Sequence, residues 1–101
     1  SNATNLSFMF LGATSFNQDL SRWNTSKVTD MNHMFSCATS FNGNVTTWDT
    51  SKVEYMLAMF YGAIAFNQNI SSWDVLNVVR NSDMFTDAES FNHDFSPRFL
   101  S

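Results

Sequence analysis

A repeat of 25 residues constrains this chain more than any other feature of its sequence. Phenylalanine followed by asparagine recurs at this spacing at Phe16, Phe41, Phe66 and Phe91. Tryptophan recurs at Trp23, Trp48 and Trp73, and Met-Phe pairs begin at Met9, Met34, Met59 and Met84. A fixed period between about 20 and 50 residues is typical of stacked repeats, in which each unit buries its apolar side against the next. The sequence therefore predicts a stack of similar units.

The repeat also predicts how the chain is divided. A chain of 101 residues is expected to form a single domain. Residues 1–3, Ser-Asn-Ala, are interpreted as the remnant of an expression tag. The remaining domain, 4–101, is divided into a half repeat (4–15), three repeats (16–40, 41–65 and 66–90) and a degenerate end (91–101).

Each repeat carries two different apolar patterns. The steps between Val28, Met31, Met34, Phe35 and Ala38 place these side chains on one face of a helix. A capping-box pattern at 51–54 predicts where the equivalent helix starts in the next repeat. The segment 19–26, ahead of the first of these helices, interleaves β-forming and polar residues and predicts a strand of three to five residues. One repeat is therefore predicted to contain a strand, a helix and a return loop.

These predictions combine into one expected fold. The apolar spacing in 20–28 follows the skeleton of leucine-rich repeats, with valine in place of the final asparagine. The expected fold is an α/β solenoid: a right-handed, leucine-rich-repeat-like stack of strand-helix units with a short parallel sheet. The Phe-Asn pairs are expected to form a spine at the return loops, with each asparagine hydrogen bonded to loop backbone.

Composition argues against several functions. The formal net charge is −4, and the five Lys and Arg residues are scattered, whereas nucleic-acid binding needs them clustered on one face. No apolar run approaches the length of a transmembrane segment. The one cysteine, Cys37, excludes an intramolecular disulfide and shares its repeat position with Gly12 and Gly62, which favours a structural role.

Few residues suggest chemistry. His33 and Asp30 are three residues apart on the outer helix face, where a solvated surface is favoured over a metal contact. Asp49 and Asp74 would lie side by side, which leaves open a hydrolytic pair or a calcium site. Capping of the following helix is the simpler interpretation. We therefore predict no catalytic residue, no metal and no cofactor.

The repeat string F-N-x-x-[LIV]-S-x-W-[DN]-[TV]-S-x-V-x-x-M-x-x-M-F-x-x-A resembles that of BspA-like bacterial surface proteins, shared with mycoplasma-type surface lipoproteins. The resemblance covers residues 4 to 96. It implies an exported, surface-attached protein on a bacterial cell, with adhesion to a host or matrix protein or glycan, and it brings no catalytic residues.

Two classes of function fit these observations: a non-catalytic binding module, or a structural spacer that projects another domain from the cell surface. The candidate binding face consists of the outward residues of the predicted strands, Arg22, Asn24, Thr47, Asp49, Ser72 and Asp74. A candidate contact patch lies off the core stripe of the second helix, at Tyr55, Leu57, Ala58 and Tyr61, and favours the binding module. The N-terminal end has no polar cap, which predicts either that the fragment is cut from a longer array or that copies self-associate there.

Overall fold

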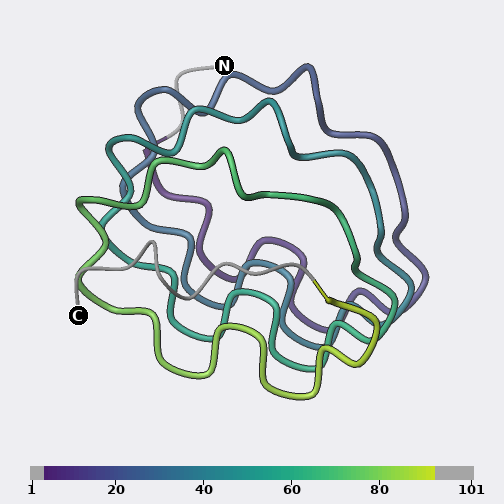
Figure 1. The fold of residues 1–101 in the computed structure, drawn as a ribbon. Coiled ribbons are helices and arrows are strands. Elements are labelled where there is room, and N and C mark those ends of the chain that lie inside the picture. Colours follow the sequence, from purple (N-terminus) through teal and green to yellow (C-terminus); the bar gives the residue numbers. More distant parts are fainter. Residues whose placement is uncertain (1–3, 93–101) are drawn as a thin grey trace.

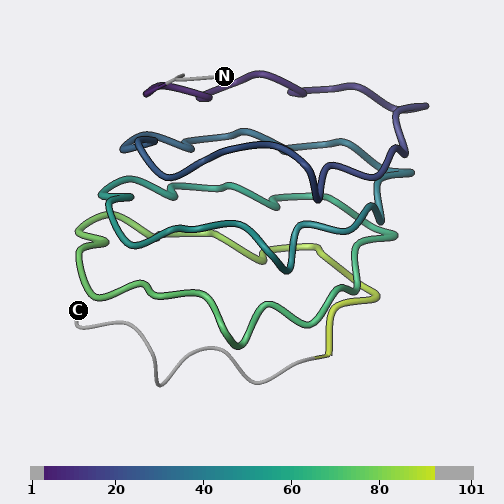
Figure 2. The same cartoon turned by 90° about the horizontal axis from the view of Figure 1, so that it is seen from above.

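The chain forms a coil in which each 25-residue repeat makes one turn and successive turns stack along a single axis (Figure 1). The computed structural model describes residues 4–92. Seen from the side, the turns lie as layers, with the turn of lowest residue numbers at one end of the stack (Figure 2). The predicted stacking of repeats is therefore present, and most of the predicted degenerate end, 93–101, lies outside the described residues.

The predicted α/β fold of strand-helix units is wrong. Residues 4–92 contain no helix and no sheet. Their only β pairing is a row of isolated parallel bridges that joins Asn5, Asp30, Tyr55 and Arg80. The chain is therefore not a leucine-rich-repeat-like α/β solenoid, and the expected parallel sheet is absent from the described part of the chain.

The predicted helix is replaced by a series of tight turns, which we call the turn side of the coil (29–41 and the equivalent residues of the other repeats). There, alternate amides donate to carbonyls of the next turn: those of Met31, His33, Phe35 and Cys37 bond to Tyr55, Leu57, Met59 and Tyr61 at 2.6–2.8 Å. The amides of Met34, Ser36 and Ala38 donate to carbonyls three residues earlier. Every second amide is thus committed to a neighbouring turn, which leaves no continuous helical ladder.

Left-handed residues fix this path. His33 has φ 56° and Cys37 has φ 61°. The equivalent positions of the other repeats also have positive φ, at Phe8, Ala58 and Asp83 and at Gly12, Gly62 and Asp87. A left-handed residue every four positions is incompatible with a right-handed α-helix, which needs negative φ throughout.

The same turns explain why the apolar pattern suggested a helix. Val28, Met31, Met34, Phe35 and Ala38 are all fully buried, as expected for the predicted core face. Turns closed by hydrogen bonds between residues three apart return the chain to the same side every three or four residues. This spacing imitates the periodicity of an amphipathic helix. The prediction of the inward residues was therefore correct, although the helix predicted to carry them was wrong.

Columns of stacked rings form the core along the coil axis. The rings of Phe16, Phe41, Phe66 and Phe91 follow one another at 5.7–5.9 Å, which confirms the predicted phenylalanine spine. A second column joins Phe10, Phe35, Phe60 and Phe85 at 5.4–5.7 Å, and a third joins Trp23, Trp48 and Trp73 at 6.1–6.2 Å. Each unit thus buries its rings on copies of themselves.

The predicted strand segments, which we call the loop side (17–28 and the equivalent residues), are joined mainly by side chains. The indole of Trp48 donates to the carbonyl of Leu20 at 2.8 Å, and the indole of Trp73 donates to Val45 at 3.0 Å. The hydroxyl of Thr25 donates to the carbonyl of Asp49. The tryptophan rings of neighbouring turns lie 6.1–6.2 Å apart. Side-chain donors to backbone carbonyls make these links between turns.

The asparagine that follows each spine phenylalanine links consecutive turns. The amide of Asn42 donates to the side-chain oxygen of Asn17 at 2.8 Å, and the amide of Asn67 donates to Asn42 at 2.8 Å. The amide of Asn92 continues the row to Asn67 at 3.3 Å. The predicted asparagine-to-backbone bonds are therefore confirmed, and they run between turns.

Candidate functional site

The predicted binding face lies on the surface of three consecutive turns of the loop side. All six of its residues are exposed: Arg22, Asn24, Thr47, Asp49, Ser72 and Asp74. The buried residues between them, Trp48 and Trp73, point inward, as expected. The structure therefore brings these polar side chains together as a row along the coil axis.

Local hydrogen bonds occupy part of this row. One side-chain oxygen of Asn24, Asp49 or Asp74 accepts the amide two residues later, at 3.0 Å in each case. Asp49 also accepts the hydroxyl of Ser51 at 2.6 Å. That hydroxyl first, and the Ser51 amide second, lower the pKa of Asp49. A general acid needs a raised pKa, so Asp49 is poorly suited to the acid role in the hydrolytic pair that its sequence position left open. Its bonds are those of a cap on a turn.

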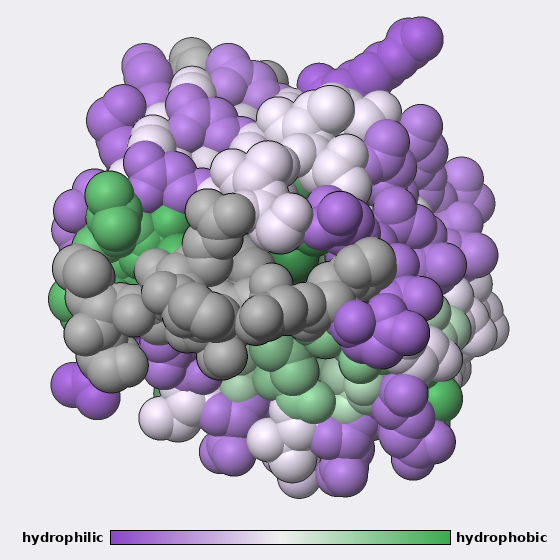
Figure 3. Space-filling model, in the orientation of Figure 1, coloured by the Kyte–Doolittle hydropathy of each residue, from purple (hydrophilic) through white to green (hydrophobic). Residues whose placement is uncertain are grey.

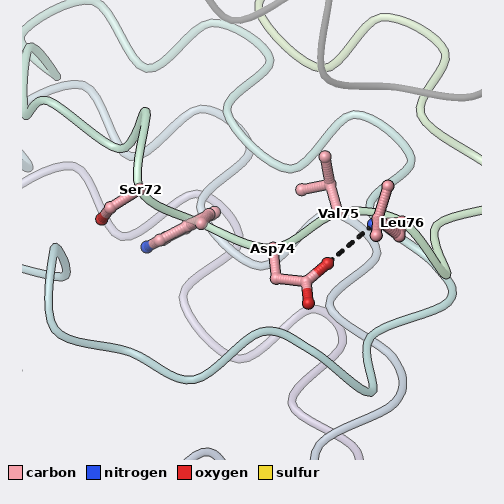
Figure 4. A pocket seen from close by; sticks show the side chains of 5 residues that line it. Ser72, Asp74, Val75 and Leu76 are labelled. Carbon is pink, nitrogen blue, oxygen red and sulfur yellow. Dashed lines mark hydrogen bonds between the residues drawn. The ribbon is translucent and has the colours of Figure 1, made fainter.

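A shallow depression lies beside the last of these polar residues. It has a volume of about 270 Å³ and is lined by residues 72–76. Figure 4 shows the Asp74 carboxylate accepting the amide of Leu76 at this site. The volume is below the roughly 300–1,000 Å³ typical of small-molecule sites, and one short segment lines it. This depression therefore supplies no pocket for a small substrate.

The predicted contact patch is only partly exposed. Tyr61 is 38 % exposed, and Tyr55 and Leu57 are half-buried. Ala58 is 5 % exposed and belongs with the buried residues rather than with the surface. Its backbone is left-handed, with φ 52°, rather than helical as predicted.

The structure adds two residues that the sequence reasoning missed. Phe8, 54 % exposed, holds the repeat position of Ala58, and Leu11, 50 % exposed, holds that of Tyr61. Together with the exposed part of the predicted patch they form what we call the outer strip: Phe8, Leu11, Tyr55, Leu57 and Tyr61. The signal that could have found it is the variation of these positions between repeats, since core positions recur almost unchanged.

His33 lies within the same surface, where its ring stacks on Phe8 at 5.1 Å with an interplanar angle of 9°. The nearby Asp30 uses a carboxylate oxygen to accept the amide of Asn32 at 2.9 Å. Within residues 4–92, no group of three or more His, Cys, Asp or Glu side chains is arranged to hold a metal ion. Cys37 is exposed and is not part of a disulfide.

Other apolar side chains reach the surface separately. Leu76 is 60 % exposed, Val79 is 62 % exposed and Ile64 is 43 % exposed. In the face shown in Figure 3, hydrophobic residues form separate groups within a largely hydrophilic surface. The described residues include no helix that is long and apolar enough to span a membrane.

Comparison with known proteins identifies a family for this chain. No curated protein and no solved structure matches the chain. The family described as Mycoplasma protein of unknown function, DUF285, matches residues 1–98, which is nearly the whole sequence. This match supports a mycoplasma-type repeat, which is the broader part of what the sequence resemblance implied. The chain therefore belongs to the DUF285 family of Mycoplasma proteins of unknown function.

Proposed function

We propose that this chain is a non-catalytic module that binds a protein through the outer strip. The observation that carries the proposal is the contrast between two sets of outward positions. On the loop side, Asn24, Asp49 and Asp74 repeat nearly the same side chain and the same local hydrogen bond. On the turn side, the exposed positions carry different side chains in different turns, as with Leu11, Tyr61 and Thr86, while Ser36 at the same repeat position is buried.

Positions whose side chains vary between repeats are not needed for the stacking of turns and are therefore available for binding. The buried columns and the hydrogen bonds between turns already stabilise the coil, and they use residues that recur. The outward turn-side residues are free of that constraint, so they can carry recognition. Residues such as Tyr61 and Phe8 supply large, amphipathic or apolar contact area of the kind enriched in protein interfaces. A protein partner with an apolar patch fits this surface better than a charged polymer does.

The location of the module is a further part of the proposal. The resemblance to BspA-like surface proteins supports placement on the outside of a bacterial cell and adhesion to a host or matrix protein or glycan. The second candidate function is a spacer that projects another domain. It is favoured by the regular stacking of turns, since identical columns such as the tryptophan rings can extend without limit.

Binding of the whole chain to a panel of purified matrix proteins and to a glycan array tests the proposal. Tyr61→Lys should abolish binding to a matrix protein, because it places a charge on the outer strip. Thr47→Lys adds the same charge at an exposed position on the loop side and serves as the matched control. Equal binding by wild type and Tyr61→Lys contradicts the assignment to the outer strip. Loss with Thr47→Lys alone assigns binding to the polar row, and no binding to any probe supports the spacer.

A further inference from the structure

One asparagine in the row that links consecutive turns is followed by glycine. The other asparagines of the row precede residues with long or ring-bearing side chains, Gln18, Gln68 and His93, whereas Asn42 precedes Gly43. A Cβ atom on Gly43 would overlap the backbone carbonyl oxygen of Gln18 in the preceding turn. The close approach of these two turns therefore requires glycine directly after Asn42.

An asparagine that precedes glycine can lose its side-chain amide without an enzyme. The backbone nitrogen of the following residue attacks the side-chain carbonyl carbon of the asparagine. Glycine favours this attack because it has no side chain to block the approach and has the freest backbone of any residue. Asparagine is counted among the thermolabile residues of proteins. The reaction needs a free attacking nitrogen, a polarised carbonyl and a leaving nitrogen that nothing holds.

The structure leaves both nitrogens of this reaction without hydrogen bonds. Asn42 is exposed to solvent, and Gly43 is half-buried. Within residues 4–92, the backbone amide of Gly43 donates no hydrogen bond, and neither does the side-chain nitrogen of Asn42. The Gly43 nitrogen is therefore available to attack, and the Asn42 side-chain nitrogen is available to leave.

The side-chain carbonyl of Asn42 is polarised by the next turn of the coil. Its Oδ1 atom accepts the backbone amide of Asn67 at 2.8 Å and Nε2 of Gln68 at 3.2 Å. One turn earlier, Oδ1 of Asn17 accepts the amide of Asn42, and within residues 4–92 it has no second donor. Attack on the carbonyl carbon places negative charge on Oδ1, and N–H donors already in position stabilise such a charge.

We propose that Asn42 and Gly43 form a site of intramolecular deamidation in the folded coil. The Gly43 nitrogen bonds to Cγ of Asn42, and the bond from Cγ to Nδ2 breaks. Ammonia leaves with the proton that the Gly43 amide loses. Water then opens the cyclic imide at either of its carbonyls, which gives aspartate or isoaspartate at position 42. The site does not involve the outer strip, so this inference does not depend on the proposed function.

The two products should affect the coil differently. Aspartate keeps an acceptor oxygen for the amide of Asn67. Isoaspartate adds one carbon to the main chain between Phe41 and Gly43 and shortens the side group by one carbon, which draws its oxygens away from Asn67. Because the row links turns at a fixed separation, the isoaspartate form should unfold at a lower temperature than the aspartate form. The reaction would thus weaken one link between turns as the molecule ages.

Ageing of the whole folded chain in a mildly alkaline buffer made with oxygen-labelled water tests the proposal. Peptide mapping by mass spectrometry should find the label at Asn42 roughly tenfold faster than at Asn17 or Asn67, a difference that corresponds to about 1.4 kcal/mol in the barrier. Isoaspartyl methyltransferase should label the same peptide. Thermal unfolding of the two product forms, separated by chromatography, measures their effect on the coil.

A pair of variants separates reaction in the folded coil from reaction in unfolded chains. Gln68→Met removes one donor to Oδ1 and should slow the reaction at Asn42 roughly threefold or more. Reaction through unfolded chains would instead be unchanged or faster, because this variant loses a bond between turns. Gln18→Met is the same substitution at the same repeat position one turn earlier, where the side chain is exposed, and should react like wild type.

An unlabelled Asn42, or equal rates at Asn17, Asn42 and Asn67, would overturn the assignment of the site. Reaction in Gln68→Met as fast as in wild type, or equal slowing by Gln18→Met, would overturn its activation by the folded coil. Equal melting of the aspartate and isoaspartate forms would overturn the effect on the link between turns.

Discussion

The indole nitrogen of Trp48 lies 2.8 Å from the carbonyl oxygen of Leu20, 28 residues earlier in the chain and in the preceding turn. Trp48 also stacks between Trp23 and Trp73, at 6.1 and 6.2 Å. One side chain therefore contributes both apolar burial and a hydrogen bond between two turns. The same pair of contacts recurs when Trp73 donates to the carbonyl of Val45.

Trp48→Ala should destabilise the fold by about 3–5 kcal/mol, because it removes a buried ring with neighbours on both sides. Trp48→Phe keeps an aromatic ring but leaves the Leu20 carbonyl without its donor, so we expect a smaller loss of about 1–3 kcal/mol. Thermal and urea unfolding of the two variants measure the difference. A Trp48→Ala protein that unfolds within a few degrees of wild type would contradict the buried column.

Replacement of Asn42 tests the asparagine row. The side-chain oxygen of Asn42 accepts the amide of Asn67 at 2.8 Å. Asn42→Ala should therefore cost about 0.5–1.5 kcal/mol of unfolding free energy, the usual net value of a hydrogen bond. Asn42→Asp retains the acceptor and is the control, with little change expected at neutral pH. Equal losses in the two variants would mean that the oxygen is not what links these turns.

The left-handed position of Cys37 gives a prediction with a definite sign. Cys37 has φ 61°, and Gly12 and Gly62 hold the same repeat position at φ 70° and 68°. Cys37→Gly should stabilise the protein by about 1 kcal/mol, because glycine adopts this conformation without the penalty of a side chain. Gly62→Ala should destabilise it by about 1–2 kcal/mol for the converse reason. If 26–38 were instead the helix that the sequence predicted, Cys37→Gly would be destabilising.

Acid titration tests the turn cap at Asp49. Hydrogen bonds from Ser51 hold the folded-state pKa of Asp49 below its ordinary value of 3.8. The carboxylate therefore contributes stability that is present above about pH 3.8 and is lost as the pH falls through the lowered value. Asp49→Asn, which keeps an acceptor oxygen like that of Asn24, should show a shallower loss of stability below pH 4.

The effect at Asp49 should be small, because the side chain is exposed to solvent. Glu89→Gln removes one negative charge at another exposed position and controls for the change in net charge. If Glu89→Gln reduces the loss of stability below pH 4 as much as Asp49→Asn does, the assignment of Asp49 as a turn cap is wrong.

The sequence alone determined the unit of the fold and what each unit buries. The 25-residue period set the stacking, and the apolar spacing identified Phe35, Met34 and their equivalents as core residues. The period also predicted the phenylalanine spine and the outward row at Asp49 and Asp74. These features depend on which residues recur at a fixed separation, and such information lies entirely in the order of the residues.

Only the tertiary structure decided the path of the chain between those points. The amide of Met31 can bond to a carbonyl within its own turn or to Tyr55 in the next turn, and local spacing does not distinguish the two. Stacking of neighbouring turns at ring-to-ring distances makes the second choice available for every other amide. It also holds His33 and Ala58 in left-handed conformations that their residue types do not favour. The helix was wrong for this reason: its competitor was a hydrogen-bond partner one full turn away, and only the assembled coil brings that partner within reach.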